Sequence, residues 1–219
     1  MTIISLVILV IAFGAQIILR FFAPLEKFFL MGFSVRFIKT IFIFAIVAVF
    51  SLLIYYSYQQ YVAWASVEPS KFLLPPYQNI DYFIQYVGAR LFSPYLISLI
   101  AALVFFYVAQ TLNKKYEERF FELEELWLGA LAIFIIGHPG WFFYFIGLIL
   151  IYLLIHIFLL LYSIYIRRSG YIRSAALRVS GHGSEVRLSL YYWWLPLAIF
   201  VIIINKWLIG LGLWRLLKI

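Results

Sequence analysis

Residues 40–64 read TIFIFAIVAVFSLLIYYSYQQYVAW, an apolar run without a charged residue that ends in a group of tyrosines and a tryptophan. An α-helix rises 1.5 Å per residue, so about 20 apolar residues cross the roughly 30 Å of hydrocarbon in a bilayer. Tyrosine and tryptophan favour the boundary between lipid and water. The stretch therefore predicts a membrane-spanning helix whose aromatic end lies at one interface.

The whole chain has this apolar character. Of its 219 residues, 66% are hydrophobic and 12% are charged, whereas about 25% of the residues of a soluble domain are charged. There is no cysteine, which excludes disulfides, thiolate metal ligands and cysteine nucleophiles. We interpret the net charge of +8 as a topology signal and predict no nucleic-acid partner. We expect an integral membrane protein.

Five further apolar stretches are long enough, alone or with flanking residues, to be predicted as spans. The predicted fold is an all-α polytopic membrane helix bundle, a single domain of about six transmembrane helices. The predicted spans are residues 2–22, 40–64, 87–112, 115–137, 141–166 and 188–204. The tail NKWLIGLGLWRLLKI mixes tryptophan with basic residues and predicts a C-terminal interfacial helix.

The fourth of these spans combines a charged and an apolar part. Residues 113–125 read NKKYEERFFELEE and lead into the apolar residues 126–137 without an intervening Gly or Pro. Twelve apolar residues make a helix of about 18 Å, too short to span alone. We therefore predict one helix over residues 115–137, with its charged half at or above the headgroups.

The basic residues predict an orientation. Residues 20–39, 113–125 and 167–187 hold four, three and five of the 17 Lys and Arg residues. Cytoplasmic loops of membrane proteins carry an excess of Lys and Arg, so these three segments are predicted to be cytoplasmic. Both termini would then lie on the non-cytoplasmic side of the cell membrane. The side chains expected to contact anionic headgroups are Arg167, Arg168, Arg173 and Arg178.

The acidic residues of the charged segment are the first candidates for chemistry. Glu118, Glu122 and Glu125 are spaced i, i+4 and i+7 and would share one face of a helix. That face continues into Gly129 and Ala132, small residues of the kind found where membrane helices approach closely. Glu122 and Glu125 are the candidate catalytic acids. The alternative is an acidic helix start that pairs with the arginines of the 167–187 segment.

Three other ionisable residues are candidates. His156 lies within the apolar stretch 141–166, where an ionisable group is rare. It is interpreted either as a neutral imidazole bonded to a neighbouring helix or as a proton or ligand site. Arg90 and Asp81, with Glu68, would lie near the outer face. They predict a local ion pair or, alternatively, a substrate-binding arginine.

The sequence contains none of the common signatures of a cofactor or metal site. It has no HxxxH or HExxH spacing, no GxSxG elbow and no glycine-rich phosphate loop that follows a strand. No cofactor and no metal ion is predicted.

Residues 113–205 resemble the second half of the prepilin peptidases, polytopic aspartyl enzymes that cleave leader peptides at the cytoplasmic membrane face. Glu124 and Glu125 precede LWLGALAIFIIG, the turn GHPGW follows, a spanning helix comes next, and Pro196 lies in the final segment. The family's Gly-Asp signature reads Glu-Glu here, and the only aspartate, Asp81, falls on the predicted outer side. The resemblance implies a diverged relative without the catalytic aspartates.

These observations favour a non-catalytic assembly or anchoring component of a larger membrane complex. Two alternatives stay open. One is a membrane-face protease or other hydrolase that uses Glu122 and Glu125, and the other is a small proton-coupled transporter or channel that uses His156.

Overall fold

The computed structural model describes residues 2–22, 29–116, 121–168 and 192–210. All of the regular secondary structure in these ranges is helical, which confirms the predicted all-α class for the described residues. The α-helices are α1 (Thr2–Phe22), α2 (Phe29–Ser66), α3 (Ile80–Val87), α4 (Ser93–Lys115), α5 (Leu123–Ile136), α6 (Gly140–Arg168) and α8 (Trp194–Gly210). A 3₁₀-helix, η2 (Ser70–Leu73), follows α2, and a π-helix, η3 (Gly88–Phe92), joins α3 to α4.

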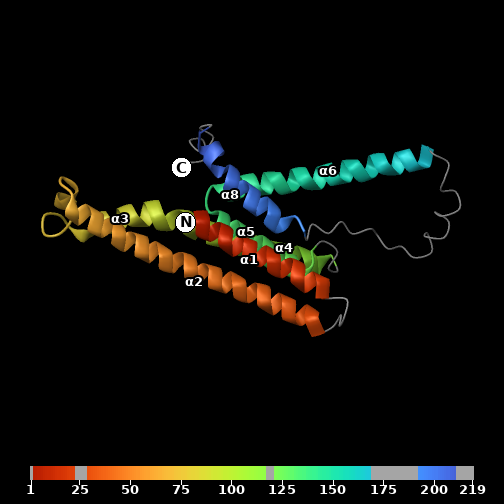
Figure 1. The fold of residues 1–219 in the computed structure, drawn as a ribbon, viewed down its shortest axis with the longest axis horizontal. Coiled ribbons are helices and arrows are strands. Elements are labelled where there is room, and N and C mark those ends of the chain that lie inside the picture. Colours follow the sequence, from red (N-terminus) through yellow and green to blue (C-terminus); the bar gives the residue numbers. More distant parts are fainter. Residues whose placement is uncertain (1, 23–28, 117–120, 169–191, 211–219) are drawn as a thin grey trace.

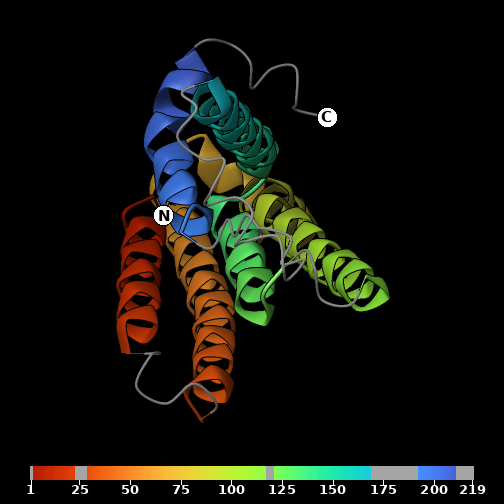
Figure 2. The same ribbon diagram turned by 90° about the vertical axis from the view of Figure 1, so that its right-hand side faces the viewer.

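Helix α5 forms the centre of the bundle. It contacts α1, α2, α4, α6 and α8, and the helices around it alternate in direction along the chain (Figures 1 and 2). From Leu128 to Ile135 every residue of α5 is buried, because helices lie on several of its sides. Gly137, with φ of +79°, ends the helix in a conformation that favours glycine.

The ends of α2 and α3 project from the bundle as a helical hairpin (Figure 1). We call residues 54–92 the outer hairpin. It has a small core of its own, formed by Leu74, Phe83 and Val87. Tyr61 and Trp64 of α2 pack against Phe83, with ring centroids 5.4 and 5.5 Å apart. The hairpin therefore has its own packed contacts beyond the main core.

Three helices are long and apolar enough to cross a membrane. They cover Val35–Ser66, Ile80–Lys115 and Gly140–Tyr162, and shorter apolar helices cover Ile3–Ile18 and Trp194–Ile204. This composition fits a membrane protein. Helix α2 begins at Phe29, before the predicted residue 40. The helical run Ile80–Lys115 includes α3 and η3 as well as the predicted span 87–112.

The predicted helix over residues 115–137 is wrong at its start. Helix α4 continues to Lys115, and a separate helix begins only at Leu123, with Glu122 in an extended N-cap conformation. Hydrogen bonds from side chains to the backbone hold this break, as described below. At the other end of the chain, α8 begins at Trp194 and continues to Gly210, so residues 205–210 extend the last helix. Residues 188–191 and 211–219 lie outside the described residues.

Candidate functional site

The described polar side chains of the acidic segment gather where α4 turns into α5. Asn113, 3% exposed, lies in the last turn of α4. Its Nδ2 donates to the carbonyl oxygen of Phe121 at 2.8 Å, and its Oδ1 accepts from the Phe121 N–H at 3.0 Å. One side chain thus satisfies both backbone groups of Phe121, which fixes the path of the chain into α5.

Glu122 and Glu125 form a capping box at the start of α5. The Glu125 carboxylate accepts from the Glu122 N–H at 2.8 Å, and the Glu122 side chain accepts from the Glu125 N–H. The Glu125 carboxylate satisfies the Glu122 N–H, which has no partner within the helix, and the Glu125 N–H also donates to the Glu122 carbonyl oxygen at 3.0 Å. Negative charge at this end is also favourable to the helix dipole. We call Asn113, Phe121, Glu122 and Glu125 the α4–α5 turn cluster.

This geometry changes the prediction for the acidic face. Glu122 lies before the helix and Glu125 at its third position, so the two acids do not form the predicted helical stripe. The structure brings them together at the cap, where Glu125 is 1% exposed. Glu118 lies outside the described residues. The paired arginines predicted from the 167–187 segment also lie outside them, apart from the backbone of Arg167 and Arg168 in α6.

The close-packing part of that prediction is better supported. Gly129 and Ala132 are both buried. A Cβ atom built on Gly129 would lie 2.6 Å from Phe105 of α4 and 2.8 Å from Trp194 of α8. Glycine therefore allows two aromatic rings to lie directly on the backbone of α5.

A buried tyrosine joins α6 to α8. The Tyr144 hydroxyl donates to the carbonyl oxygen of Trp194 at 3.0 Å, and Tyr144 is fully buried. This carbonyl belongs to the first residue of α8. The bond orients the start of α8 on the bundle.

Replacing Tyr144 with phenylalanine is expected to lower the free energy of unfolding by about 1 kcal/mol, because the carbonyl of Trp194 loses a buried donor. The measurement is the denaturant midpoint of the purified protein in detergent. Tyr162→Phe is the matched control, since Tyr162 is exposed on α6, and it should leave the midpoint unchanged. Equal effects of the two substitutions would contradict the assigned role.

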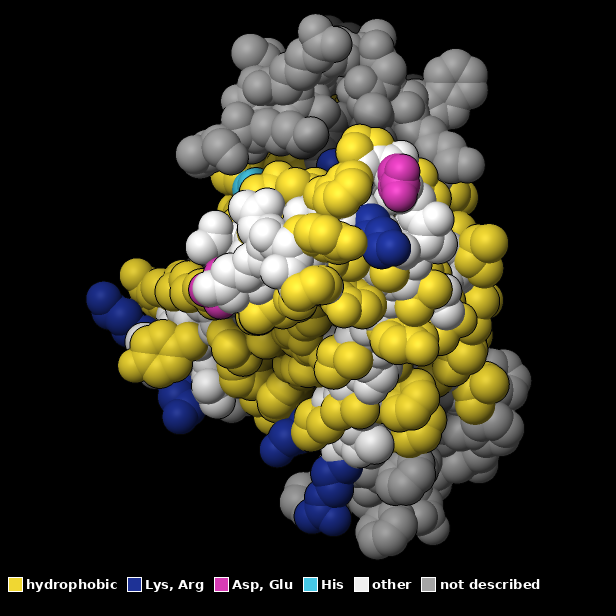
Figure 3. Space-filling view, turned by 90° about the vertical axis from the view of Figure 1, so that its left-hand side faces the viewer, with side chains coloured by type: hydrophobic (Ala, Val, Ile, Leu, Met, Phe, Trp, Pro, Cys, Tyr) yellow, Lys and Arg dark blue, Asp and Glu magenta, His cyan; other side chains and the backbone are white. Residues whose placement is uncertain are grey.

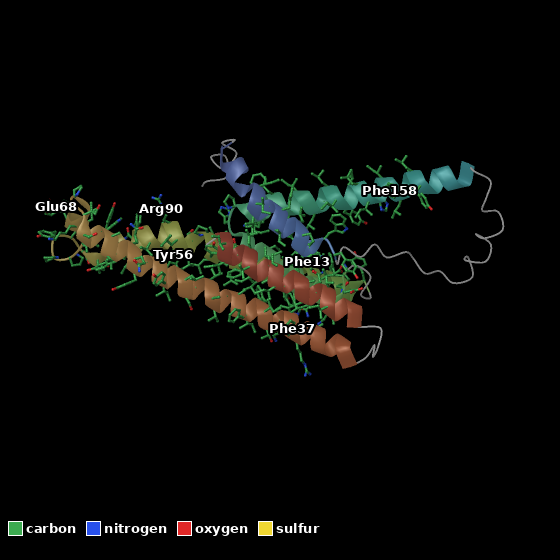
Figure 4. The ribbon with its side chains drawn as sticks, in the orientation of Figure 1. Phe13, Phe37, Tyr56, Glu68, Arg90 and Phe158 are labelled. Carbon is green, nitrogen blue, oxygen red and sulfur yellow. The ribbon has the colours of Figure 1, made fainter. Side chains whose placement is uncertain are left out.

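The outer hairpin does not contain the predicted ion pair. Arg90 donates to the Tyr86 hydroxyl at 3.2 Å and lies over the Tyr86 ring at 5.6 Å. Asp81 instead accepts from Asn79 at 2.7 Å, at the start of α3. Glu68 lies at the tip of the hairpin and Arg90 farther along it (Figure 4). The partner of Arg90 is therefore Tyr86 and not the predicted carboxylate. Tyr86 precedes Arg90 by four residues, so the two side chains lie one turn apart on the same helical run.

His156 lies on the surface of α6 and not inside the bundle. It is exposed, and its ring stacks on that of Tyr152 with centroids 5.8 Å apart and an interplanar angle of 20°. It makes no hydrogen bond to the described residues. The described helices therefore do not surround His156, and they form no proton or substrate path around it of the kind that the transporter alternative requires.

The turn between α5 and α6 holds the other described histidine. His138 donates its backbone N–H to the carbonyl oxygen of Pro94 at 3.2 Å. Burial lowers the pKa of the imidazole below its ordinary value of 6.5, so the side chain is neutral at pH 7. His138 and His156 lie on separate parts of the fold, and no group of three or more His, Asp or Glu residues among the described residues could hold a metal ion.

Sequence reasoning did not identify Asn113 or Tyr144. Asn113 carried a signal in retrospect, since it is the polar amide at the boundary between an apolar stretch and a charged one. Tyr144 had none, because it is one of 17 tyrosines and only its neighbours distinguish it. Comparison of the chain with protein-family models, with curated proteins and with solved structures finds no match.

Proposed function

We propose that this chain is a six-span protein of the cell membrane that acts as a non-catalytic component of a larger membrane complex, with the outer hairpin as its partner-binding part. The observation that carries the proposal is the projection of this hairpin beyond the other helices (Figure 1). Its exposed side chains include several aromatic rings, and its two acidic and two basic residues balance in charge. In the proposed arrangement it reaches the non-cytoplasmic side.

Helix lengths support the placement of the bilayer. From Lys39 to Tyr58 the rise along α2 is about 29 Å, and from Lys114 back to Ser93 along α4 it is about 32 Å. Each stretch is long enough to cross roughly 30 Å of hydrocarbon. The two are offset along the bundle, because Phe92 packs on Phe50 with ring centroids 6.3 Å apart, and the residues beyond Tyr58 at the tip of the outer hairpin are the ones proposed to lie in the headgroups or outside the membrane.

The direction of the helices supports the proposed orientation. The end of α1, the start of α2, the end of α4 and the end of α6 all lie toward the same end of the molecule (Figure 1). Arg36 and Lys39, both exposed, belong to this end of α2, and Lys114 and Lys115 to the same end of α4. Basic residues at one end favour a cytoplasmic location for it.

The surface of the outer hairpin suits a protein partner. Exposed aromatic side chains from Tyr58 onward are Tyr58, Phe72, Tyr77 and Tyr82. Viewed from the hairpin end, the molecule shows mainly hydrophobic side chains with isolated charges (Figure 3). Aromatic residues are enriched in protein interfaces and lose little side-chain entropy on binding.

The chain lacks cysteine, so single cysteines can test the orientation without background. In sealed cells a membrane-impermeant maleimide should label Ser70→Cys in the hairpin, and should label Arg36→Cys, exposed before the proposed hydrocarbon segment of α2, only after permeabilisation. The reverse pattern would contradict the orientation. Labelling of both sites in sealed cells, with the protein in the soluble fraction, would contradict membrane insertion.

Membership of a complex is tested in native-like membranes. A photo-crosslinker at Tyr58 or Tyr82 should trap one defined protein, identified by mass spectrometry, whereas the same group at Val47, exposed on the proposed lipid-facing part of α2, should not. A strictly monomeric particle after mild extraction, together with no crosslink from the hairpin, would contradict the proposed role.

The neighbouring carboxylates of Glu122 and Glu125 favour one second candidate, a membrane-face hydrolase that resembles the prepilin peptidases. Two adjacent acids can act as acid and base when their pKa values differ. Glu125→Gln keeps an oxygen that can accept from the Glu122 N–H but removes the carboxylate. Cleavage of a pilin leader peptide by membrane vesicles should then fall at least 100-fold in Glu125→Gln and not in Glu124→Gln. Absence of cleavage by the unaltered protein would contradict this candidate.

A further inference from the structure

Arg90 of the outer hairpin carries a charge that no described carboxylate neutralises. Its guanidinium has Tyr86 as hydrogen-bond partner, and among the described residues no carboxylate is in ion-pair contact with it. Asp81, the acid closest to it in sequence, accepts from Asn79 and precedes Arg90 by nine residues. The next acid along the chain is Glu117, beyond the far end of α4, and α2 contains none. The described helices at this level therefore supply no counter-ion.

Two contacts with α2 define the level of Arg90 along the molecule. The ring of Phe92 packs on that of Phe50 with centroids 6.3 Å apart, and the ring of Tyr86 packs on that of Trp64 with centroids 4.8 Å apart. Arg90 lies between these two contacts on its helical run. It is therefore level with the α2 residues about midway between Phe50 and Trp64.

The α2 residues at this level are tyrosines. Figure 4 shows Arg90 and Tyr56 at similar positions along the long axis of the molecule. Tyr55, Tyr56 and Tyr58 are exposed, and exposed tyrosine favours the boundary between lipid and water. In the proposed placement, Arg90 therefore lies at the outer boundary of the hydrocarbon, beside the headgroups.

Tyr86 holds the guanidinium in one orientation. Nη1 of Arg90 donates to the Tyr86 hydroxyl at 3.2 Å, and Cζ lies 5.6 Å from the ring centroid. Because Tyr86 lies one turn nearer the hairpin tip, the guanidinium extends away from the hydrocarbon, as long basic side chains do near a membrane interface. The contact with Trp64 in turn fixes the ring of Tyr86.

We propose, on the basis of the placement and orientation proposed above, that Arg90 and Tyr86 bind the phosphate of a phospholipid in the outer leaflet. Arginine has five N–H donors, and those not bonded to Tyr86 can donate as a pair to two phosphate oxygens. The Tyr86 hydroxyl accepts from Arg90 and keeps its own hydrogen to donate. A phosphate diester carries one negative charge, which matches the charge of Arg90.

The bilayer is the source of phosphate that fits this position. A phospholipid has its phosphate at the depth of Arg90 and its acyl chains on the hydrocarbon side of it. Ile97 and Ile100, on the following turns of α4, are exposed and offer these chains an apolar surface. A free phosphate ion or an acidic segment of a protein would use the charge of Arg90 but not this surface.

Native mass spectrometry in mild detergent tests the site with phosphatidylglycerol as the probe. The unaltered protein should retain one more tightly bound lipid than Arg90→Gln, whose affinity at this site should fall about ten-fold, as for loss of a hydrogen bond to a charged group. Lys71→Gln is the matched control, since Lys71 is exposed at the hairpin tip, and it should retain as much lipid as the unaltered protein. Equal retention by all three proteins, or equal losses in the two variants, would overturn the proposal.

Two further variants test the geometry of the pair. Arg90→Lys keeps the charge but not the planar group that donates to two oxygens, and Tyr86→Phe keeps the ring on Trp64 but not the hydroxyl. Each should weaken lipid binding, and each by less than Arg90→Gln. Full retention of the lipid in both variants would show that charge alone attracts it and would overturn the assigned pair.

Competition distinguishes the possible sources of the anion. Inorganic phosphate in excess should not displace the retained lipid. A photo-crosslinker at Ala89, exposed next to Arg90, should react with lipid in native-like membranes. Displacement by inorganic phosphate, or a crosslink from Ala89 to a protein alone, would overturn the assignment to a phospholipid.

The depth of the site separates this proposal from the proposed function. A nitroxide attached to Ala89→Cys in vesicles should be found at the level of the headgroups, by its relative accessibility to oxygen and to a water-soluble paramagnetic complex. A nitroxide at the bilayer centre or fully in water would contradict the membrane placement on which both proposals rest. A nitroxide at headgroup depth, with lipid retention unaffected by Arg90→Gln, would overturn only the phosphate site.

Discussion

Replacing Gly129 with alanine is expected to lower the free energy of unfolding by about 1–3 kcal/mol, the usual effect of overpacking a core. The new methyl group would lie 2.6 Å from Phe105 and 2.8 Å from Trp194. Trp194 cannot move freely, because it is 2% exposed and its ring also contacts the rings of Tyr144 and Phe121 at tilted or edge-on angles. The Phe105 ring is held between the rings of Phe145 and Trp194. Denaturant or thermal unfolding in detergent measures the change.

Gly14→Ala is the matched control for this experiment. Gly14 lies within α1, and a Cβ atom there would meet nothing within 4 Å. In a helix interior without such contacts, alanine is favoured over glycine by about 1 kcal/mol. The two identical substitutions should therefore change the stability in opposite directions. Equal stabilisation by both would show that α4 and α8 do not pack on α5 as described.

Replacing Asn113 with alanine is expected to lower the free energy of unfolding by about 2 kcal/mol. Both hydrogen bonds to Phe121 are lost, and its N–H and carbonyl oxygen are left partly buried without that partner. The start of α5 should loosen as well, because Phe121 immediately precedes the capping box. Hydrogen exchange of residues 121–126, measured by mass spectrometry, should rise more than that of α2.

Gln59→Ala provides the control for the loss of an amide side chain. Gln59 donates to Tyr55 at 3.1 Å on an exposed surface, where a hydrogen bond contributes little. It should leave both stability and hydrogen exchange near those of the unaltered protein. A local effect of Asn113→Ala no larger than that of Gln59→Ala would contradict the assignment of Asn113 to the α4–α5 turn.

Several features were predictable because they depend on local chemistry. Apolar runs of about 20 residues form helices wherever backbone groups must be satisfied within the segment, and the described residues of the predicted spans are helical apart from 116, 121–122, 137 and 192–193. The spacing of Gly129 and Ala132 predicted close packing, and the approach of Phe105 and Trp194 to Gly129 agrees with it.

Other features were not predictable from the same residues. Nothing between Lys115 and Gly137 is a strong helix breaker, so periodicity predicted one helix there. The break depends on Asn113, which satisfies the backbone of Phe121 from eight residues away. Glu122 and Glu125 have the spacing of a capping box, but the same spacing also fits a helix interior. Only the turn decides between them.

The surroundings of Arg90 and His156 were also not predictable from the sequence. Arg90 has carboxylates nearby in sequence, yet Tyr86 on its own helical run is its observed partner. His156 looked like an internal residue because its neighbours in sequence are apolar. In a chain that is apolar on all sides, low polarity does not distinguish a surface for lipid or another helix from a buried one.

The sequence by itself determined the class of this protein, the approximate positions of its helices and the segments that carry basic charge, because length, hydropathy and charge are properties of single stretches. The tertiary structure alone decided that α5 lies at the centre, that Glu122 and Glu125 cap a helix, and that half of α6 stands clear of the bundle. These outcomes depend on shape complementarity between helices whose surfaces are almost equally apolar. In such helices the hydrophobic periodicity does not indicate which surface packs against which neighbour.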